Sequence, residues 1–258
     1  MLGTACGGPS AEATRLRLAT TTSTRDSGLL DWLLPPFEAA TGIEVQVVAV
    51  GTGQALALGR RGDADLLLVH ARRREDAFLA AGDGLERRDV MWNDFVLVGP
   101  RDDPAGIRGL GDGARALARI GAHRAVFISR GDDSGTHTRE RALWKKAGGR
   151  PAWDGYLEAG QGMGACLTIA DEKQAYTLTD RGTWLARRSL SDLVVLVEGH
   201  PALRNPYGTI LVDPRRHPGV HAEAARKLFE YLTSREGQER IGAYRVDGVA
   251  LFHPVKGP

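Results

Sequence analysis

An alternation of strand-like and helix-like segments constrains the fold of this chain more than any other feature. From Leu16 the chain runs through "LRLATTTST", "DSGLLDWLLPPFEAATG", "IEVQVVAV", "GTGQALALGRRG" and "ADLLLVHA". The second segment spaces its leucines as a helix does, and the fifth is continuously apolar, like a strand that is buried on both faces of a sheet. This order predicts an α/β fold with mainly parallel sheets flanked by helices. Pro35 and Pro36 lie inside the first helical segment, where we expect them to break or kink it.

The pattern resumes in the second half of the chain, with a strand at "RAVFIS" and a helix over about 134–147. Two segments stand apart, 93–106 and 205–219, because each reads as a strand that ends in a proline-rich turn. We interpret them as two crossings between two lobes. The predicted division is a leader over 1–14, a discontinuous lobe I over 15–96 plus 207–258, and a lobe II over 97–206.

The charge pattern argues against nucleic acid as a partner. The formal net charge is +2, and arginines are interspersed with acidic residues, as in "ARRREDAF". A nucleic-acid-binding protein concentrates its basic residues on one face. A small anion needs only one well-placed guanidinium.

The N-terminal segment "MLGTACGGPSAEATR" bears on the location of the protein. Cys6 follows "LGTA", which resembles the cleavage end of a bacterial lipoprotein signal without its charged and apolar parts. The alternative is a leader with an incidental cysteine. Cys6 and Cys166 are the two cysteines of the chain, which gives no disulfide framework, and neither has neighbours of a metal-binding type.

Four turns at strand-to-helix junctions share a chemistry that suits anions. In parallel α/β sheets, ligands bind beyond the carboxyl ends of the strands, where such loops lead into helices. Small residues there let backbone N–H groups approach a ligand, and the first N–H groups of a helix have no partner within it. The helix dipole adds partial positive charge. We call these the four donor turns: 20–24, 51–54, 130–136 and 160–164.

The third donor turn, "RGDDSGTH", carries the most informative residues. Arg130 follows a predicted strand and supplies a positive fork that suits an oxyanion, while Asp132 is placed to hold that fork by an ion pair. Ser134, Gly135 and Thr136 open the next helix and offer N–H and hydroxyl donors. The turn therefore predicts an oxyanion site.

Two other interpretations of this turn stay open. In the first, Ser134 or Asp133 only caps the helix and Arg130 lies on the surface. In the second, Ser134 and His137 act on a phosphate or sulfate ester, because a spacing of three places both side chains on one helix face. That hydrolase would use a helix-opening donor as its nucleophile, which is an unfavourable position.

With these motifs, the chain resembles the substrate-binding proteins of bacterial tungstate importers of the ABC class over 18–252. The stretches that carry the resemblance include "TTTSTRDSGLL", "VVAVGTGQALALG", "GDADLLLVHA", "SRGDDSGTH", "YLEAGQGMGA", "AYTLTDRGT" and "NPYG". "RGDDSGT" also resembles the loop of periplasmic phosphate-binding proteins. Two departures are Trp92, which stands where we expect a tyrosine, and the absent or truncated export signal.

The resemblance implies a type II periplasmic binding protein that is a monomer and not an enzyme, with two lobes that close on one oxyanion. The implied ligand is tungstate or molybdate, with no cofactor and no metal cation. The implied partner is an ABC permease, and the implied location is the periplasm or the outer face of the cytoplasmic membrane, with or without a lipid on Cys6. The implied anion-binding residues are Thr21, Thr22, Ser23 and Thr52 in lobe I, and Arg130, Ser134, Gly135, Thr136 and the Gly162–Met163 backbone in lobe II, with Asp132 behind Arg130.

Phosphate is the alternative ligand. Hydrogen phosphate keeps a proton at neutral pH and so benefits from a carboxylate acceptor, whereas tungstate, molybdate and sulfate need donors only. Asp132 or Asp133 could be that acceptor, although we expect Asp132 to be paired with Arg130.

Overall fold

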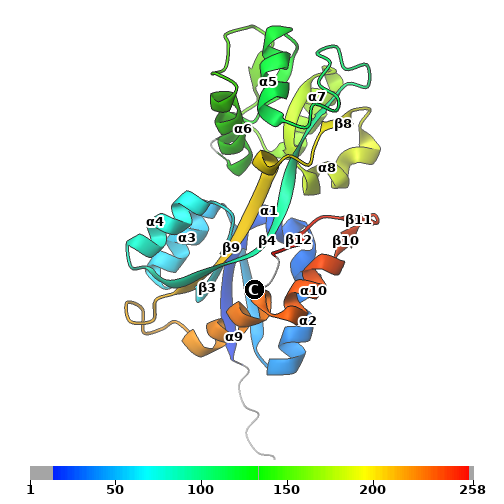
Figure 1. Ribbon diagram of the computed structural model, residues 1–258. Helices are drawn as coiled ribbons and strands as arrows, with labels where there is room; N and C mark the ends of the chain where they lie inside the picture. Colours follow the sequence, from blue (N-terminus) through cyan, green and yellow to red (C-terminus); the bar gives the residue numbers. More distant parts are fainter. Residues whose placement is uncertain (1–13, 133, 256–258) are drawn as a thin grey trace, which may run out of the picture.

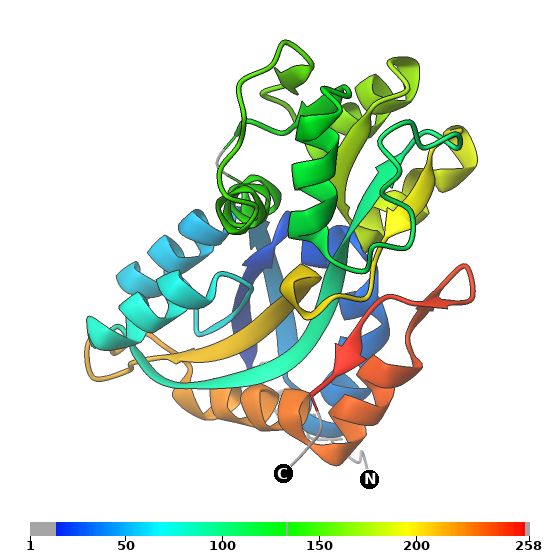
Figure 2. The same cartoon turned by 45° about the horizontal axis from the view of Figure 1, so that its top comes forward.

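The computed structural model describes residues 14–132 and 134–255, which form two lobes joined by two long strands (Figure 1). The strands are β4 (Gly84–Gly99) and β9 (Arg204–Val212), and they pair in antiparallel register from Gly84 opposite Val212 to Asp94 opposite Arg204. Figure 2 shows them running side by side between the lobes. The α/β class and the two crossings are as the sequence predicts. The first crossing strand, however, begins at Gly84 rather than near Asn93.

Lobe I is built on the strand order β2-β1-β3-β9-β4, in which β1 is parallel to β2 and β3, and β9 is antiparallel to β3. Alternate residues of β3 pack on opposite faces: Leu66 and Leu68 lie in one apolar cluster, Leu67 and Val69 in another. This confirms the strand buried on both faces. The other elements of the lobe are β1 (Arg15–Thr21), α1 (Thr22–Asp26), α2 (Leu29–Thr41), β2 (Glu44–Val50), α3 (Thr52–Arg61), β3 (Leu66–Val69), α4 (Arg72–Ala80), α9 (Ala222–Thr233), α10 (Arg235–Ala243) and the short β10 (Arg245–Val246), β11 (Val249–Ala250) and β12 (His253–Pro254).

Lobe II continues the order from β4 through β7 and β5 to β6, with β5 parallel to both neighbours and β8 antiparallel to β4. Helices flank this sheet too (Figure 1). Its elements are α5 (Gly113–Ala122), β5 (Phe127–Ser129), α6 (Gly135–Lys146), β6 (Tyr156–Glu158), α7 (Met163–Glu172), β7 (Tyr176–Asp180), α8 (Arg181–Arg187), a 3-10 turn Arg188–Leu190, β8 (Val194–Val197) and a second 3-10 turn Pro201–Leu203.

The C-terminal helices pack back on lobe I, as the apolar spacing of 225–232 predicts. Leu228, Phe229 and Leu232 of α9 are fully buried. Burying each such side chain contributes about 1.5–3 kcal/mol. The tail therefore completes lobe I after the chain has returned from lobe II.

Of the two outcomes expected for Pro35 and Pro36, a break or a kink, the break is wrong. Helix α2 runs through both residues. Proline lacks an N–H, so Pro36 cannot bond the carbonyl of Trp32 four residues earlier. Arg240 of α10 donates to that carbonyl instead, at 2.9 Å. A residue from the far end of the chain thus satisfies the acceptor that the proline leaves open.

Trp92 stands where the resemblance leads us to expect a tyrosine. Its ring lies against the side chains of His253 and Arg204, beside the crossing strands. Its ring stacks on His253 with centroids 4.0 Å apart, and the guanidinium of Arg204 lies 4.7 Å from the ring centroid. Here the indole joins the C-terminal strand β12 to β4 and β9.

Candidate functional site

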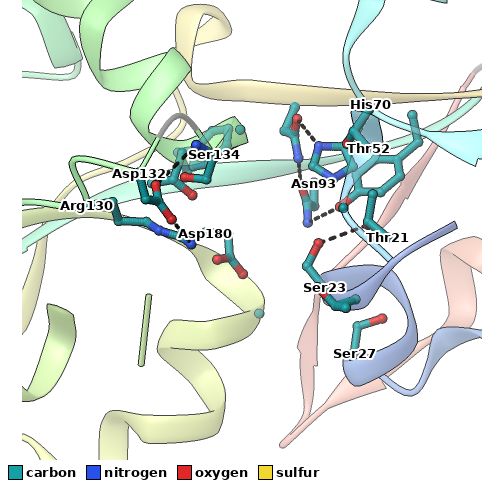
Figure 3. Close-up of a pocket in the computed structure, with 18 of the residues that line it drawn as sticks. Thr21, Ser23, Ser27, Thr52, His70, Asn93, Arg130, Asp132, Ser134 and Asp180 are labelled. Carbon is teal, nitrogen blue, oxygen red and sulfur yellow. Dashed lines mark hydrogen bonds and ion pairs between the residues drawn. The ribbon is translucent and has the colours of Figure 1, made fainter. Parts of the chain in front are cut away.

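A cavity of about 320 Å³ lies between the lobes, at the carboxyl ends of strands from both sheets. Figure 3 shows Arg130, Asp132 and Ser134 on one side of it, facing Thr21, Ser23 and Thr52 on the other. The first three donor turns therefore meet across one space. The cavity is lined by Thr21, Thr22, Ser23, Ser27, Gly51, Thr52, Gly53, His70, Arg74, Asn93, Phe95, Arg130, Asp132, Ser134, Gly135, Thr136, Asp180, Gly182, Asn205, Tyr207 and Leu251.

The lobe I wall presents hydroxyl groups held in a local network. Thr21 ends β1 and caps α1, and its Oγ1 accepts a hydrogen bond from the backbone N–H of Thr24 at 3.3 Å. The Thr21 hydroxyl also lies 2.7 Å from that of Thr24 and 3.1 Å from that of Ser23. Thr22 and Ser23 are exposed at the cavity, and Thr52 opens α3 nearby. These side chains offer uncharged donors, and Arg74 of α4 adds a guanidinium to the lobe I side of the lining.

The lobe II wall is charged and is shaped by one glycine. Gly131 has φ +61°, and a Cβ there would lie 2.9 Å from the Cβ of Glu158, so a side chain would meet both strain and a clash. The sharp turn at Gly131 brings Asp132 back to form an ion pair with Arg130. The same carboxylate accepts the N–H of Ser134 at 3.1 Å. The expected Arg130–Asp132 pair is thus present.

Ser134 caps α6, since its Oγ accepts the backbone N–H of His137 at 3.2 Å. Capping alone does not describe the turn, because Arg130 lines the cavity with a side chain only 20% exposed, and its buried Nε has no hydrogen-bond partner among the described residues. Buried guanidinium nitrogens are normally bonded. The Asp133 alternative lies outside the described residues.

Asp132 is held as a carboxylate. Its burial would raise its pKa, but contacts with Ser134 and the charge of Arg130 outweigh that effect and leave the pKa below its ordinary value. The lobe II wall therefore contains the negative charge of Asp132 beside the positive charge of Arg130.

The cavity also contains residues that the sequence analysis missed. His70 follows β3, Asp180 ends β7, and Asn93, Asn205 and Tyr207 come from the crossing strands β4 and β9. The first two lie at carboxyl ends of strands, so the rule that identified the donor turns would have identified them in "LLLVHA" and "YTLTD". The last three gave no such signal, because side chains in the middle of strands read as sheet residues.

The fourth donor turn is not part of the cavity lining. Gly162 caps α7, and Met163 is 5% exposed within the apolar core. The turn instead supports the third one, because the N–H of Gly160 donates to the carbonyl of Arg130 at 2.8 Å. Gly162 and Met163 thus follow Gly160, the residue whose N–H holds the backbone of Arg130 in place.

The described residues contain neither a metal-type cluster nor a helix that could span a membrane. Across 14–132 and 134–255, there is no group of three or more His, Cys, Asp and Glu residues placed to hold a metal ion. Within the same part of the chain, no helix combines the length and apolar character that crossing a bilayer requires. Cys6 lies outside the described residues.

Comparisons with known proteins agree with this architecture. The PBP superfamily domain matches residues 8–236. The tungstate-binding protein TupA of Peptoclostridium acidaminophilum is 52% identical over 92% of this chain and 84% of its own length, and that of Campylobacter jejuni subsp. jejuni is 38% identical over 89% and 87%.

Two solved structures are also similar over most of their length. The tungstate-binding protein TupA from Desulfovibrio alaskensis G20 has a TM-score of 0.90 and 46% identity, covering 94% of this chain and 99% of that one. The tungstate ABC transporter structure from Geobacter sulfurreducens has a TM-score of 0.81 and 54% identity, covering 89% and 98%. The two-lobed periplasmic binding protein fold is confirmed, and the chain belongs to the PBP superfamily and, within it, to the family of the tungstate-binding protein TupA.

Proposed function

We propose that this protein is the extracytoplasmic substrate-binding protein of an ABC importer, and that it captures tungstate between its lobes. The observation that carries the proposal is the cavity in which Arg130 and the start of α6 face the hydroxyl groups of Thr21, Thr22 and Ser23. The names of the relatives support tungstate in particular. Molybdate has the same charge and shape and is the alternative metal oxyanion.

The energetic problem is to remove a dianion from water. Burial without partners would be prohibitive, but directed donors can replace the hydration shell, each charge-assisted bond contributing about 1.5–3 kcal/mol. Six to eight such bonds can reach about −12 kcal/mol, the nanomolar range, after the costs of association are subtracted. The proposed donors are Thr21, Thr22, Ser23, Thr52, Arg130, Ser134, Gly135 and Thr136.

Closure of the lobes is the proposed mechanism of capture. The two walls come from different lobes, so a ligand that bridges them favours the closed form. We place lobe I at 15–96 plus 207–258 and lobe II at 97–206, with β4 and β9 as the hinge. The Gly162–Met163 backbone does not line the cavity, so we propose that it contacts the anion only if the fourth donor turn moves toward it.

Two alternatives differ in their use of the third donor turn. Phosphate binding is favoured by the presence of two carboxylates, Asp132 and Asp180, in the lining, because hydrogen phosphate needs an acceptor. Ester hydrolysis is disfavoured by the role of Ser134 as a helix cap, where its Oγ already accepts a hydrogen bond. We therefore propose a binding protein rather than an enzyme, with no cofactor.

We propose that the protein acts as a monomer outside the cytoplasmic membrane, and that its closed form is what the ABC permease recognises. Whether Cys6 carries a lipid can be tested by mass spectrometry of the protein from its native membrane.

Calorimetric titration with tungstate, molybdate, sulfate and phosphate tests the proposed ligand. We expect heat and submicromolar affinity with tungstate, and a competition titration against molybdate gives the order of the two. Absence of binding to either metal oxyanion would contradict the proposal. Tight phosphate binding that Asp132→Asn removes would favour the phosphate alternative, and turnover of a chromogenic ester that Ser134→Ala abolishes would favour the hydrolase.

A further inference from the structure

One side chain of the cavity can change its charge in the neutral pH range. His70 follows the carboxyl end of β3, and a Cβ built on Gly135 would lie 3.5 Å from its Cε1. Cε1 is flanked by both ring nitrogens, so this edge of the imidazole faces the start of α6, where Arg130, Ser134 and Gly135 line the same cavity. Figure 3 shows His70 on the lobe I side of the space.

Two amides from the crossing strands fix the tautomer of His70. Asn93 Nδ2 donates to the Tyr207 hydroxyl at 3.2 Å, and Asn205 Nδ2 donates to Asn93 Oδ1 at 2.9 Å. These bonds orient the amide of Asn205 with its Oδ1 toward His70 Nδ1, at 3.2 Å. A carbonyl oxygen only accepts, so Nδ1 carries the hydrogen and Nε2 of the neutral ring is a lone-pair acceptor.

A neutral His70 offers the wrong polarity to a dianion. Burial lowers the pKa of His70 below its ordinary value, more than its hydrogen bond to Asn205 and the charge of Asp180 raise it. The ring is therefore mostly neutral at pH 7 without ligand. Among the described residues, the charged or titratable groups that line the cavity with it are Asp180 from β7, Asp132 and Arg130 from the third donor turn, Arg74 from α4 and Tyr207 from β9.

A bound dianion reverses this balance. Two negative charges in the same cavity favour the imidazolium, and protonation converts Nε2 from an acceptor into a donor. Resting on the proposed function, we propose that capture of the oxyanion is coupled to uptake of one proton by Nε2 of His70. The proton comes from the solvent, so the bond formed is Nε2–H and the net charge brought into the cavity is one negative charge rather than two.

The sign of the pH dependence follows from linkage. Ligand binding raises the pKa of His70, so protons are taken up only between the pKa of the free protein and that of the complex. Within that window affinity increases as pH falls, by up to about tenfold per pH unit for one proton. Outside it affinity is independent of pH. Tungstate itself stays fully deprotonated across neutral pH, so the uptake belongs to the protein.

The test is calorimetric titration of the wild-type protein with tungstate between pH 6.5 and 8, in buffers of different ionisation enthalpy, such as Tris and PIPES. The slope of the observed enthalpy against the ionisation enthalpy gives the number of protons taken up. We expect each bound tungstate to be accompanied by uptake of a fraction of a proton, and this fraction should approach one at pH values between the pKa of His70 in the free protein and in the complex. The His70→Gln variant should lose this uptake. His123→Gln, on the exposed C-terminus of α5, is the matched control and should keep it.

Each other outcome has a defined meaning. Tight binding without proton uptake at any pH overturns the coupling and leaves the proposed function intact. Uptake that persists in His70→Gln but disappears in Asp180→Asn places the proton on the carboxylate and also overturns it. Failure of the wild type to bind either metal oxyanion overturns the proposed function and the coupling with it. If His70→Gln does not fold, the wild-type slope and the change of affinity with pH still decide.

Discussion

The two walls of the cavity bind by different means. In lobe I, Thr21, Ser23 and Thr24 bond to one another through neutral hydroxyl groups. In lobe II, the guanidinium of Arg130 is paired with Asp132, and the same carboxylate bonds the start of α6. We call this hydroxyl network the neutral wall, although Arg74 of α4 also lines the cavity from lobe I. The neutral wall is held in shape by its own hydrogen bonds, whereas the charged wall of lobe II keeps Arg130 in place with Asp132 as its counter-ion.

We infer that the two walls contribute differently to ligand binding. The hydroxyl groups donate directional hydrogen bonds, so they select a ligand by the positions of its oxygen atoms. Because they are uncharged, they attract an anion only weakly at long range. The guanidinium groups of Arg130 and Arg74 supply the positive charge that attracts a dianion, and Asp132 limits how strongly the site attracts other anions. We expect substitutions in the two walls to differ in size accordingly.

The largest effect should come from Arg130→Ala. Loss of a charge-assisted contact of about 1.5–3 kcal/mol should weaken tungstate binding roughly 10- to 150-fold, measured by calorimetry. Arg130→Lys is the matched control, because it keeps the charge but loses the planar fork. It should recover only part of the affinity. An unchanged dissociation constant for Arg130→Ala would remove the charged wall from the site.

A smaller effect is expected in the neutral wall. Thr22 is exposed at the cavity, so Thr22→Ala removes a hydroxyl without emptying the core. A neutral hydrogen bond of about 0.5–1.5 kcal/mol corresponds to a loss of roughly 2- to 13-fold in affinity. Thr22→Ser keeps the hydroxyl and should bind like the wild type. A loss as large as that of Arg130→Ala would contradict the division between the walls.

The sequence predicts the elements of the fold better than the interactions between distant ones. The strand "ADLLLVHA" and the helix faces follow from local apolar periodicity, and both are present. The first half of β4, "GLERRDV", was missed because its charges resemble a surface turn. In the structure Arg87 is 6% exposed and its Nε donates to Glu75 at 2.6 Å, a pairing that periodicity cannot show.

The same limit applies to α2 and to the cavity. The sequence shows that Pro36 leaves a carbonyl without its helical donor, but not that Arg240, more than 200 residues later, supplies one. Likewise the donor turns were found from local composition, whereas Asn93 and Asn205 enter the cavity only because β4 and β9 pair side by side. Donor groups that are close in the sequence can be predicted from it, whereas side chains that only sheet pairing brings together cannot.

The walls also differ in what anchors them from behind. In lobe I, Thr20, the first residue of the first donor turn, donates its hydroxyl to the carbonyl of Leu68 at 2.7 Å, a neutral contact. In lobe II, Ser129 just before Arg130 donates to the buried carboxyl of Glu140 at 2.7 Å, and Tyr156 donates to the same carboxyl at 2.7 Å. Burial raises the pKa of Glu140, against the lowering effect of these hydrogen bonds.

The smallest predicted effect is therefore a pH dependence of stability that belongs to lobe II. Because the folded pKa of Glu140 is raised, its contribution is fully present below the unfolded pKa and is lost as pH rises through the folded value. Glu140→Gln removes that loss, so the melting temperature of the variant relative to the wild type should increase from about pH 4 upward and then level off.

The control for this measurement is Glu230→Gln, an exposed position on α9, whose melting temperature should follow that of the wild type at every pH. A constant difference between Glu140→Gln and the wild type from pH 4 to 8 would mean that Glu140 is ionised in the folded protein with no penalty. The anchor behind Arg130 would then act through packing and hydrogen bonds alone, as Thr20 does in lobe I. The contrast between the lobes would in that case be confined to the groups that face the ligand.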